Sequence, residues 1–543
     1  METMGQPATE PSALPSGIGI DDSDGAILAD IQGNILRGYN MRFVRHLVVR
    51  VQDPVAARAF LRAALSGADG TPSVTTAEIW DEGTKPATCL NVGVTATGLR
   101  ALGLREEWLS TFPEEFREGA PRRAAKVGDI DASSPEHWRD GLGDADAVHL
   151  MWTIHALDDK AELEAVAARL ESAWRESAAF AVTARLDGAT LDTYTQNPDD
   201  RDTVHFGYRD SISQPRFVVN GDYVGRMDAQ PIATVGAVLL GRVGPPDGQR
   251  AEAERYRTTF PGISWQMPEA HLGHTTVELG VNGCFNAFRV LEQDVHGFEE
   301  FLENSARQIE HELARRREGE PPAPDEPVWD KERVAAKLMG RWRNGMPLSL
   351  SHWTPGHPGH DRFDGPGLPA PMDPAYLNDF DYIDEVEELD DFDGTHCPLG
   401  AHIRRTNPRG SQIVQRSANF TRPIVRRGMP YGPPYDPDNP DDGERRGLLG
   451  SFMCASLIAQ YEAIMYDWAN LGLQDPRVTG TNDPIIGANR PETSRFEIPI
   501  EGADPVVLTG FPRFTQTTGA IYLFCPSIST LRFLGDLRPS ATR

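Results

Sequence analysis

The chain is 543 residues long, 39% hydrophobic and 8% aromatic, which suffices for two buried cores or one duplicated fold and excludes wholesale disorder. Its formal net charge of −27 repels phosphate backbones and anionic membranes, which argues against nucleic-acid and membrane partners.

The N-terminus and the cysteines indicate the compartment. Residues 1–24 are rich in Pro, Ser and Gly, without the basic start or apolar core of a signal peptide, and we expect a disordered tail there. The five cysteines are scattered and form no CxxC pair, which favours a reducing compartment. The longest nearly apolar run, 448–459, is too short to span a bilayer and predicts a core helix. We therefore expect a cytoplasmic protein.

Strands and helices alternate in the first part of the chain. Residues 42–52 alternate like a strand, and 54–67 carry helical spacing. The same order recurs at 87–104 and at 147–174. These strands are too polar for a parallel sheet that is buried on both faces, so we predict an antiparallel sheet with helices packed on one face.

A second copy of this order begins near residue 280. A strand is predicted at 283–293 and an amphipathic helix at 295–317. Strand-to-helix passages follow at 448–471 and 518–534. No repeat is visible at the level of single residues, so the duplication is a structural hypothesis.

These patterns divide the chain into predicted regions. Two long segments rich in Pro, Gly and Asp, 353–395 and 429–447, interrupt the second copy and are typical of functional coverings or insertions. We predict a tail at 1–24, an N-terminal domain at 25–225, a linker at 226–279 and a C-terminal domain at 280–543.

The first motif, "HFGYRDSISQPRF", spans residues 205–217 and contains Asp210. Aspartate followed by serine, with a proline shortly after, is by itself typical of a turn or a helix cap. The motif alone therefore assigns no function to Asp210.

The second motif, "THCPLGAHIRRTNPRG", places His402 ahead of Arg404, Arg405 and Arg409. A lone histidine is most often a core or surface residue. Neutral imidazole is also the commonest protein ligand of transition metals, and neighbouring arginines can neutralise carboxylates such as haem propionates. These two features raise the odds of a metal ligand beside a bound anion above those of an ordinary histidine.

A zinc site is the alternative interpretation of the same stretch. His396, Cys397 and His402 carry suitable ligand atoms. Their spacing does not match a structural zinc site, and a fourth ligand is not evident. We therefore regard zinc as the weaker hypothesis.

The third motif, "IVRRGMPYGPPY", ends an apolar strand with Arg426 and Arg427. Such a strand end often faces solvent. A guanidinium that points into a pocket would instead stabilise negative charge as it develops.

Together these stretches resemble the larger members of the dye-decolourising peroxidase family, which are haem enzymes. The family's distal GxxDG motif stands here as "GYRDSISQP", and its proximal stretch resembles "CPLGAHIRRTNPR". The segment "DIQGNILRG" at 30–38 matches the start of such domains, and the resemblance extends to about residue 535. It implies an α+β fold of two ferredoxin-like units, each an antiparallel sheet with helices packed on it, as in a dimeric α+β barrel.

The resemblance also implies roles for individual residues. His402 would be the axial ligand of the haem iron, and Asp210 the distal acid–base residue. Arg426, rather than Arg427, would be the distal arginine. Asp483 sits where the family often keeps a carboxylate that accepts the other N–H of the axial histidine. The candidates for contacts with the haem propionates are Arg404, Arg405 and Arg409.

The implied activity is a haem-dependent peroxidase. It would reduce hydrogen peroxide at one non-covalent haem b per chain and oxidise dyes, phenols or other small aromatic donors. Asp210 would move the peroxide proton, and Arg426 would stabilise the departing negative charge. Bulky donors would be oxidised through aromatic residues nearer the surface, for which the candidates are Trp353, Tyr376, Tyr431 and Trp468. The sequence leaves open whether the chain forms a homo-oligomer.

One position departs from the family pattern, because Ser211 replaces the last glycine of the distal motif. If this position needs a positive φ, serine costs about 1 kcal/mol there. The departure motivates the alternative of a haem carrier, sensor or iron-releasing protein with weak peroxidase activity. A haem-free scaffold on the same fold is the third hypothesis.

Overall fold

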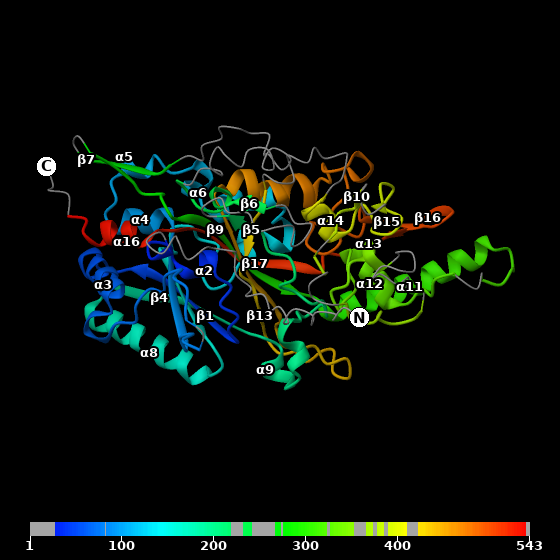
Figure 1. Cartoon of the computed structure of the whole chain (residues 1–543), viewed down its shortest axis with the longest axis horizontal. Coiled ribbons are helices and arrows are strands. Elements are labelled where there is room, and N and C mark those ends of the chain that lie inside the picture. Colours follow the sequence, from blue (N-terminus) through cyan, green and yellow to red (C-terminus); the bar gives the residue numbers. More distant parts are fainter. Residues whose placement is uncertain are drawn as a thin grey trace, which may run out of the picture.

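The fold is built around one nine-stranded sheet, in the order β12-β14-β9-β17-β2-β3-β1-β4, with β13 paired to β14 (Figure 1). The computed structural model describes residues 28–81, 83–218, 232–241, 267–272, 275–322, 326–351, 365–372, 377–378, 380–384, 389–409 and 422–538. The predicted tail at 1–24 lies outside these ranges.

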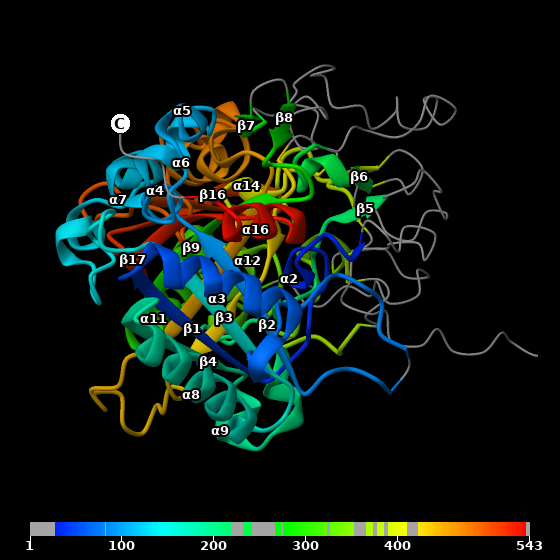
Figure 2. The ribbon, with the colours of Figure 1, turned by 90° about the vertical axis from the view of Figure 1, so that its left-hand side faces the viewer.

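The N-terminal half of the sheet is a ferredoxin-like unit. Its strands β1 (Phe43–Val51), β2 (Thr88–Val94), β3 (Leu150–Ala156) and β4 (Phe180–Ala189) are antiparallel, in the order β2-β3-β1-β4. Helix α3 (Pro54–Ser66) connects β1 to β2, and α8 (Lys160–Ser177) connects β3 to β4. Both helices lie on the same side of these strands (Figure 2). Strand, helix, strand, strand, helix, strand is the ferredoxin-like order.

The C-terminal half repeats this arrangement. Its elements in chain order are β9 (Cys284–Gln293), α11 (Val295–Arg316), β12 (Val425–Arg426) with β13 (Met429–Tyr431), β14 (Gly447–Cys454), the helical turns η9 (Leu457–Glu462) and η10 (Ile464–Asn470), and β17 (Thr515–Cys525). The predicted duplication is therefore confirmed. The strand-to-helix passage predicted at 448–471 is confirmed, because the chain is strand up to Cys454 and becomes helical at Leu457. The prediction of a core helix over 448–459 was therefore wrong.

The remaining elements are short or surround the sheet. The helices are α2 (Gly33–Leu36), α4 (Ala96–Ala101), α5 (Glu106–Leu109), α6 (Glu114–Glu118), α7 (Ala120–Arg123), α9 (Asp192–Thr195), α12 (Lys331–Met339), α13 (Leu348–Ser351), α14 (His402–Thr406) and α16 (Ile528–Gly535). The strand pairs are β5 (Arg216–Val218) with β6 (Ile232–Thr234), β7 (Glu269–Leu272) with β8 (Thr275–Glu278), β10 (Ile383–Asp384) with β11 (Leu389–Asp390), and β15 (Arg495–Ile500) with β16 (Ala503–Thr509). Among the described helices, none combines the length and the apolar character needed to cross a membrane.

The two units meet at a narrow seam. Strands β17 and β2 share one residue pair, Phe524 with Val94. The buried amide of Gln32 strengthens this seam, because its nitrogen donates to the carbonyls of Val92 in the first unit and Pro526 in the second, at 2.8 and 2.9 Å. Gln32 belongs to the "DIQGNILRG" segment, so this segment joins the units.

Alternate residues of each strand enter different cores. Val44 and Val48 of β1 pack in one cluster with Phe288 of β9 and Ile521 of β17. Leu47 of the same strand faces the opposite way, into the cluster that includes residues of α3 and α8. Since β13 also lies beside β4, the first cluster fills the interior of a barrel made by both units.

Three buried histidines have strongly lowered pKa values. Burial lowers the pKa of His46 to about 3, and His46 packs on Phe288 inside the barrel with ring centroids 4.7 Å apart. Burial, assisted by Arg427, lowers the pKa of His155 to about 4. Burial also lowers that of His205 to about 4. All three imidazoles are therefore neutral at pH 7.

Acidification is expected to destabilise the protein through these histidines. Between pH 6.5 and 4 the unfolded chain binds protons that the folded chain does not, so the free energy of unfolding falls as the pH falls. For His46 the loss reaches at most about 3 kcal/mol by pH 4. Chemical denaturation of wild type and His46→Gln across this window measures the effect. The variant should lose less stability on acidification; equal losses would contradict the assignment to His46.

Candidate functional site

Two backbone hydrogen bonds hold the loop that carries Asp210. The Asp210 backbone N–H donates to the Asp202 carbonyl at 2.7 Å, and the Arg209 N–H donates to the Arg343 carbonyl at 2.8 Å. A side chain at Gly345 would come within 2.6 Å of Ile212 Cδ1, so the loop that follows α12 packs directly against the Asp210 loop.

Arg426 reaches the Asp210 loop from the edge of the sheet. It ends β12, which pairs with β14 through Arg426 and Phe452. Its Nη1 donates to Asp210 Oδ1 at 3.1 Å, and its Nη2 donates to the Ser213 carbonyl at 2.9 Å. The structure thus brings together two predicted site residues that are 216 positions apart in sequence.

Charged neighbours keep Asp210 acidic. Burial raises the pKa of this carboxyl, but the charge and hydrogen bond of Arg426, together with the Ser211 N–H, outweigh burial, and the pKa lies below its usual value. The His402 imidazole also lowers the pKa of Asp210. The Asp210 side chain is therefore an ionised carboxylate at neutral pH.

His402 begins α14, which lies beside the helical turns of η10 (Figure 1). Its Nδ1 hydrogen-bonds to Asp483 Oδ2 at 2.9 Å. The other oxygen of the fully buried Asp483 accepts the backbone N–H groups of Ile485 and Ile486, which fixes the carboxylate. No group in the described part of the chain hydrogen-bonds to His402 Nε2, so this nitrogen can bind a metal ion.

The pKa of Asp483 shows the strength of this pair. Burial raises the pKa, but the charge and hydrogen bond of His402, together with the charge of Arg405, lower it below the usual value. The carboxylate thus stays ionised, orients the imidazole and increases its basicity.

Arg404 and Arg405 make their described contacts with the protein itself. Arg404 donates to Asp391 Oδ2 at 2.8 Å and to the Cys397 carbonyl at 2.6 Å. Arg405 donates to the carbonyls of Gly400 and Thr481 at 2.9 and 3.0 Å. These bonds fix the loop that leads into α14. Contacts of both arginines with propionates stay a prediction.

Arg409 is also buried. It donates to the carbonyls of Asn378 and Phe380 at 2.8 and 2.9 Å, and its guanidinium lies 4.1 Å from the centroid of the Phe380 ring. Its contact with a propionate likewise stays a prediction.

Arg341 is a further cation that the sequence analysis missed. It is 6% exposed and donates to the Gly345 carbonyl at 3.0 Å. Burial, with repulsion by Arg409 and Arg426, lowers its pKa to about 9. No carboxylate pairs with Arg341 among the described residues, so its positive charge is not neutralised by an ion pair there. Nothing in "MGRWRNG" distinguishes it from a surface arginine.

Arg427 points away from Asp210. Its Nε donates to the carbonyl of Asn34 at 3.0 Å, in helix α2 of the "DIQGNILRG" segment. The adjacent Gly33 is required there, because a Cβ would collide with the hydroxyl of Tyr39 and the carbonyl of Thr76. The structure therefore brings Arg426, and not Arg427, to Asp210.

Ser211 has a φ of 64°, in the left-handed region that favours glycine. The condition under which serine is costly is thus met. Ser211 is adjacent to Asp210, and backbone strain is often retained at functional sites.

Glycine at position 211 is expected to stabilise the protein. Ser211→Gly should raise the free energy of unfolding by about 0.5–1 kcal/mol, and Ser211→Val should lower it by more than about 1 kcal/mol, because a β-branched side chain fits this region poorly. Denaturant titration measures both. Ser134→Gly is the control, since Ser134 has a φ of −72° and glycine should not stabilise there. A Ser211→Gly protein less stable than wild type would refute the strain.

The other predicted residues are less informative. Tyr431 is half-buried, Trp468 is 4% exposed, and Trp353 and Tyr376 lie outside the described residues.

Within the described ranges, no three His, Cys, Asp or Glu side chains form a cluster that could hold a metal ion, so the zinc hypothesis gains no support.

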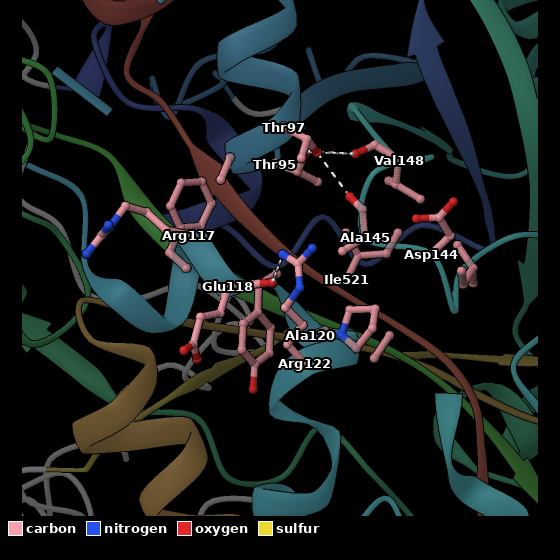
Figure 3. Close-up of a pocket in the computed structure, with 17 residues that line it drawn as sticks. Thr95, Thr97, Arg117, Glu118, Ala120, Arg122, Asp144, Ala145, Val148 and Ile521 are labelled. Atoms are coloured by element: carbon pink, nitrogen blue, oxygen red, sulfur yellow. Dashed lines mark hydrogen bonds between the residues drawn. The ribbon is translucent and has the colours of Figure 1, made fainter. Parts of the chain in front are cut away.

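A small cavity lies elsewhere, lined among others by Thr97, Arg122 and Asp144 (Figure 3). Its volume of about 20 Å³ suits a single water molecule. None of the residues in the three motifs lines it, so it is separate from the candidate site.

Comparisons with known proteins show which proteins this chain resembles in sequence and fold. A family model described as the DyP dimeric alpha+beta barrel domain matches residues 30–190. Peroxidase 2 of Mycetinis scorodonius is 27% identical over 94% of this chain and 88% of its own length. The multifunctional dye peroxidase DyP2 of an Amycolatopsis species is 27% identical over 94% of this chain and 96% of its own length.

Solved structures share the fold. The crystal structure of a fungal DyP-type peroxidase from Auricularia auricula-judae matches with a TM-score of 0.71 at 24% identity, covering 94% of this chain and 99% of that one. A dye-decolorizing peroxidase in complex with 2,6-dimethoxyphenol matches with a TM-score of 0.67 at 25% identity and the same coverage.

Proposed function

We propose that this chain, which resembles the dye-decolourising peroxidases over most of its length, is a peroxidase of that family that reduces hydrogen peroxide at a non-covalently bound haem b while it oxidises small aromatic or dye-like donors. The observation that carries the proposal is the assembled set of Asp210, Arg426 and His402, with His402 anchored by Asp483.

The residues present fit a haem. His402 Nε2 has no hydrogen-bond partner among the described residues, while its Nδ1 is held by a carboxylate, as in iron-ligating histidines. Arg341, buried without an acidic partner in the described ranges, suits an anionic ligand. His402 would hold the iron, and Arg341 and Arg409 are candidates for the propionates. When bound, haem supplies the iron that binds peroxide and stores the oxidising equivalents.

Asp210 is proposed as the residue that moves the proton. Its carboxylate is ionised and can accept the proton of one oxygen of hydrogen peroxide. It can then return this proton to the other oxygen, which leaves as water. This role requires the ionised form, so activity should be lost at a pH below the lowered pKa of Asp210.

Arg426 is proposed to serve this transfer in two ways. Its guanidinium holds Asp210 ionised, and its fixed charge stabilises negative charge on the departing oxygen. The hydrogen bond between Asp483 and His402 would make the imidazole a stronger electron donor to a bound iron.

The visible spectrum tests this function. The purified protein, supplied with haem, should show a Soret band that changes with one equivalent of hydrogen peroxide and returns when 2,6-dimethoxyphenol is added. A Soret band that is indifferent to peroxide would favour the alternative of haem carriage or sensing, which the strained Ser211 motivates. No Soret band after reconstitution would leave a haem-free scaffold.

A further inference from the structure

Gln214 makes two complementary hydrogen bonds with the backbone of Arg426. Its Nε2 donates to the Arg426 carbonyl at 3.0 Å, and its Oε1 accepts the Arg426 N–H at 3.2 Å. One side-chain amide thus satisfies both backbone groups of the arginine that contacts Asp210. A single hydrogen bond would allow rotation, whereas two parallel ones define an orientation.

These bonds occupy the outer edge of a very short strand. Strand β12 is two residues long and pairs with β14 on one side. On the other side the Gln214 amide takes the place of a neighbouring strand for Arg426, so the edge is not left unpaired. A two-residue strand has few ladder bonds of its own, and its position therefore depends on this contact.

The same loop meets the guanidinium of Arg426. Asp210 Oδ1 and the Ser213 carbonyl accept hydrogen bonds from its two terminal nitrogens. Residues 210–214 therefore hold both ends of Arg426, with the backbone at Gln214 and the side chain at Asp210. Two backbone bonds attach this loop to other parts of the protein: the Asp210 N–H donates to the Asp202 carbonyl, and the Arg209 N–H donates to the Arg343 carbonyl. Neither bond involves Arg426.

We propose that Gln214 is a positioning residue, which fixes the distance between the Asp210 carboxylate and the Arg426 guanidinium by holding the backbone of Arg426. The inference rests on the proposed function and adds to it the residue that aligns the acid–base pair. Gln214 reaches the backbone of Arg426 with both polar atoms of its amide, so its action on the peroxide is through Arg426.

Loss of the amide should alter Asp210 in a defined direction. The groups that lower the pKa of Asp210 are Arg426 from β12, His402 from α14 and the Ser211 N–H, while Arg209 and Asp202 flank it on its own loop. Burial opposes ionisation. If Arg426 moves away, its charge no longer offsets burial, and the pKa of Asp210 rises.

The test compares Gln214→Met, which keeps the size of the side chain and removes both hydrogen bonds, with Gln516→Met. Gln516 donates one bond to the Ala132 carbonyl at 2.6 Å and belongs to β17, outside the proposed machinery. The rate of the Soret change is measured against peroxide concentration from pH 3 to 8. We expect the second-order rate constant of Gln214→Met to fall by about 10- to 100-fold. The acidic limb of its pH profile should move up by about 0.5–1 unit. Gln516→Met should change neither.

The outcomes separate this inference from the proposed function. A wild type without a peroxide reaction would overturn the function itself. A wild type that reacts, with a Gln214→Met profile unchanged in rate and limb, would overturn the role of Gln214. A slower reaction without a shifted limb would also overturn it, because general loosening does not change the pKa of Asp210. If Gln214→Met does not fold, Gln214→Asn, which keeps the amide one methylene short, must show the same shift.

Discussion

Replacement of Asp210 by asparagine is expected to slow the reaction with hydrogen peroxide by about 10²–10⁴-fold. Asparagine has nearly the same shape and can still bind Arg426, but it cannot accept the peroxide proton. The ion pair at 3.1 Å becomes a hydrogen bond between charged Arg426 and a neutral amide, and the haem spectrum should change little. Stopped-flow measurement of the Soret change at several peroxide concentrations gives the rate constant.

Arg426→Leu is the companion variant. It removes the positive charge that keeps Asp210 ionised and stabilises the departing oxygen, so it should also slow the reaction and shift the acidic limb upward. The pH profile separates the two variants, because Asp210→Asn should have no limb from that carboxyl. Peroxide rates equal to wild type in both would refute the assignment of the distal pair.

Replacement of His402 by alanine is expected to abolish stable haem binding. It removes the imidazole whose Nε2 is placed for the iron and leaves Asp483 buried without the partner that lowers its pKa. Reconstitution with haem, followed by gel filtration and the ratio of Soret to protein absorbance, measures retention. A Soret band of wild-type intensity and position in His402→Ala would refute the axial assignment.

Asp483→Asn probes the same site more gently. Asparagine keeps an oxygen for the N–H groups of Ile485 and Ile486, but it turns an NH2 group toward His402 Nδ1, so the imidazole loses both the negative charge and its hydrogen-bond acceptor. We expect haem to remain bound with an affinity about 10- to 100-fold lower. Thr406 bonds the backbone of His402 through its hydroxyl, so Thr406→Val serves as a control that leaves Nδ1 unchanged.

Much of the fold could be read from local patterns. Alternation over 42–52 and helical spacing over 54–67 depend on nearest neighbours, and the structure has β1 and α3 there. The apolar run 448–459 was misread because a strand buried in a two-unit core and a buried helix have the same composition. The domain boundaries remain a prediction.

The candidate site divides in the same way. The roles of Asp210, His402, Arg426 and Asp483 were predicted from the family resemblance, since each lies in a stretch that carries it. Gln214 lies in the first motif but was not named, and Arg341 lies outside all three motifs. Their importance arises from contacts with residues far away in sequence, such as Gln214 with Arg426, 212 positions apart.

The amino-acid sequence by itself determined the order of strands and helices, the acidic character of the chain and the residue types offered to the site, because these depend on neighbouring residues. Only the tertiary structure decided that Ser211 adopts a positive φ and that Gln214 replaces a missing strand beside β12. Each of these depends on how two ferredoxin-like units close on one another, and the free energy of that closure is spread over contacts between distant parts of the chain.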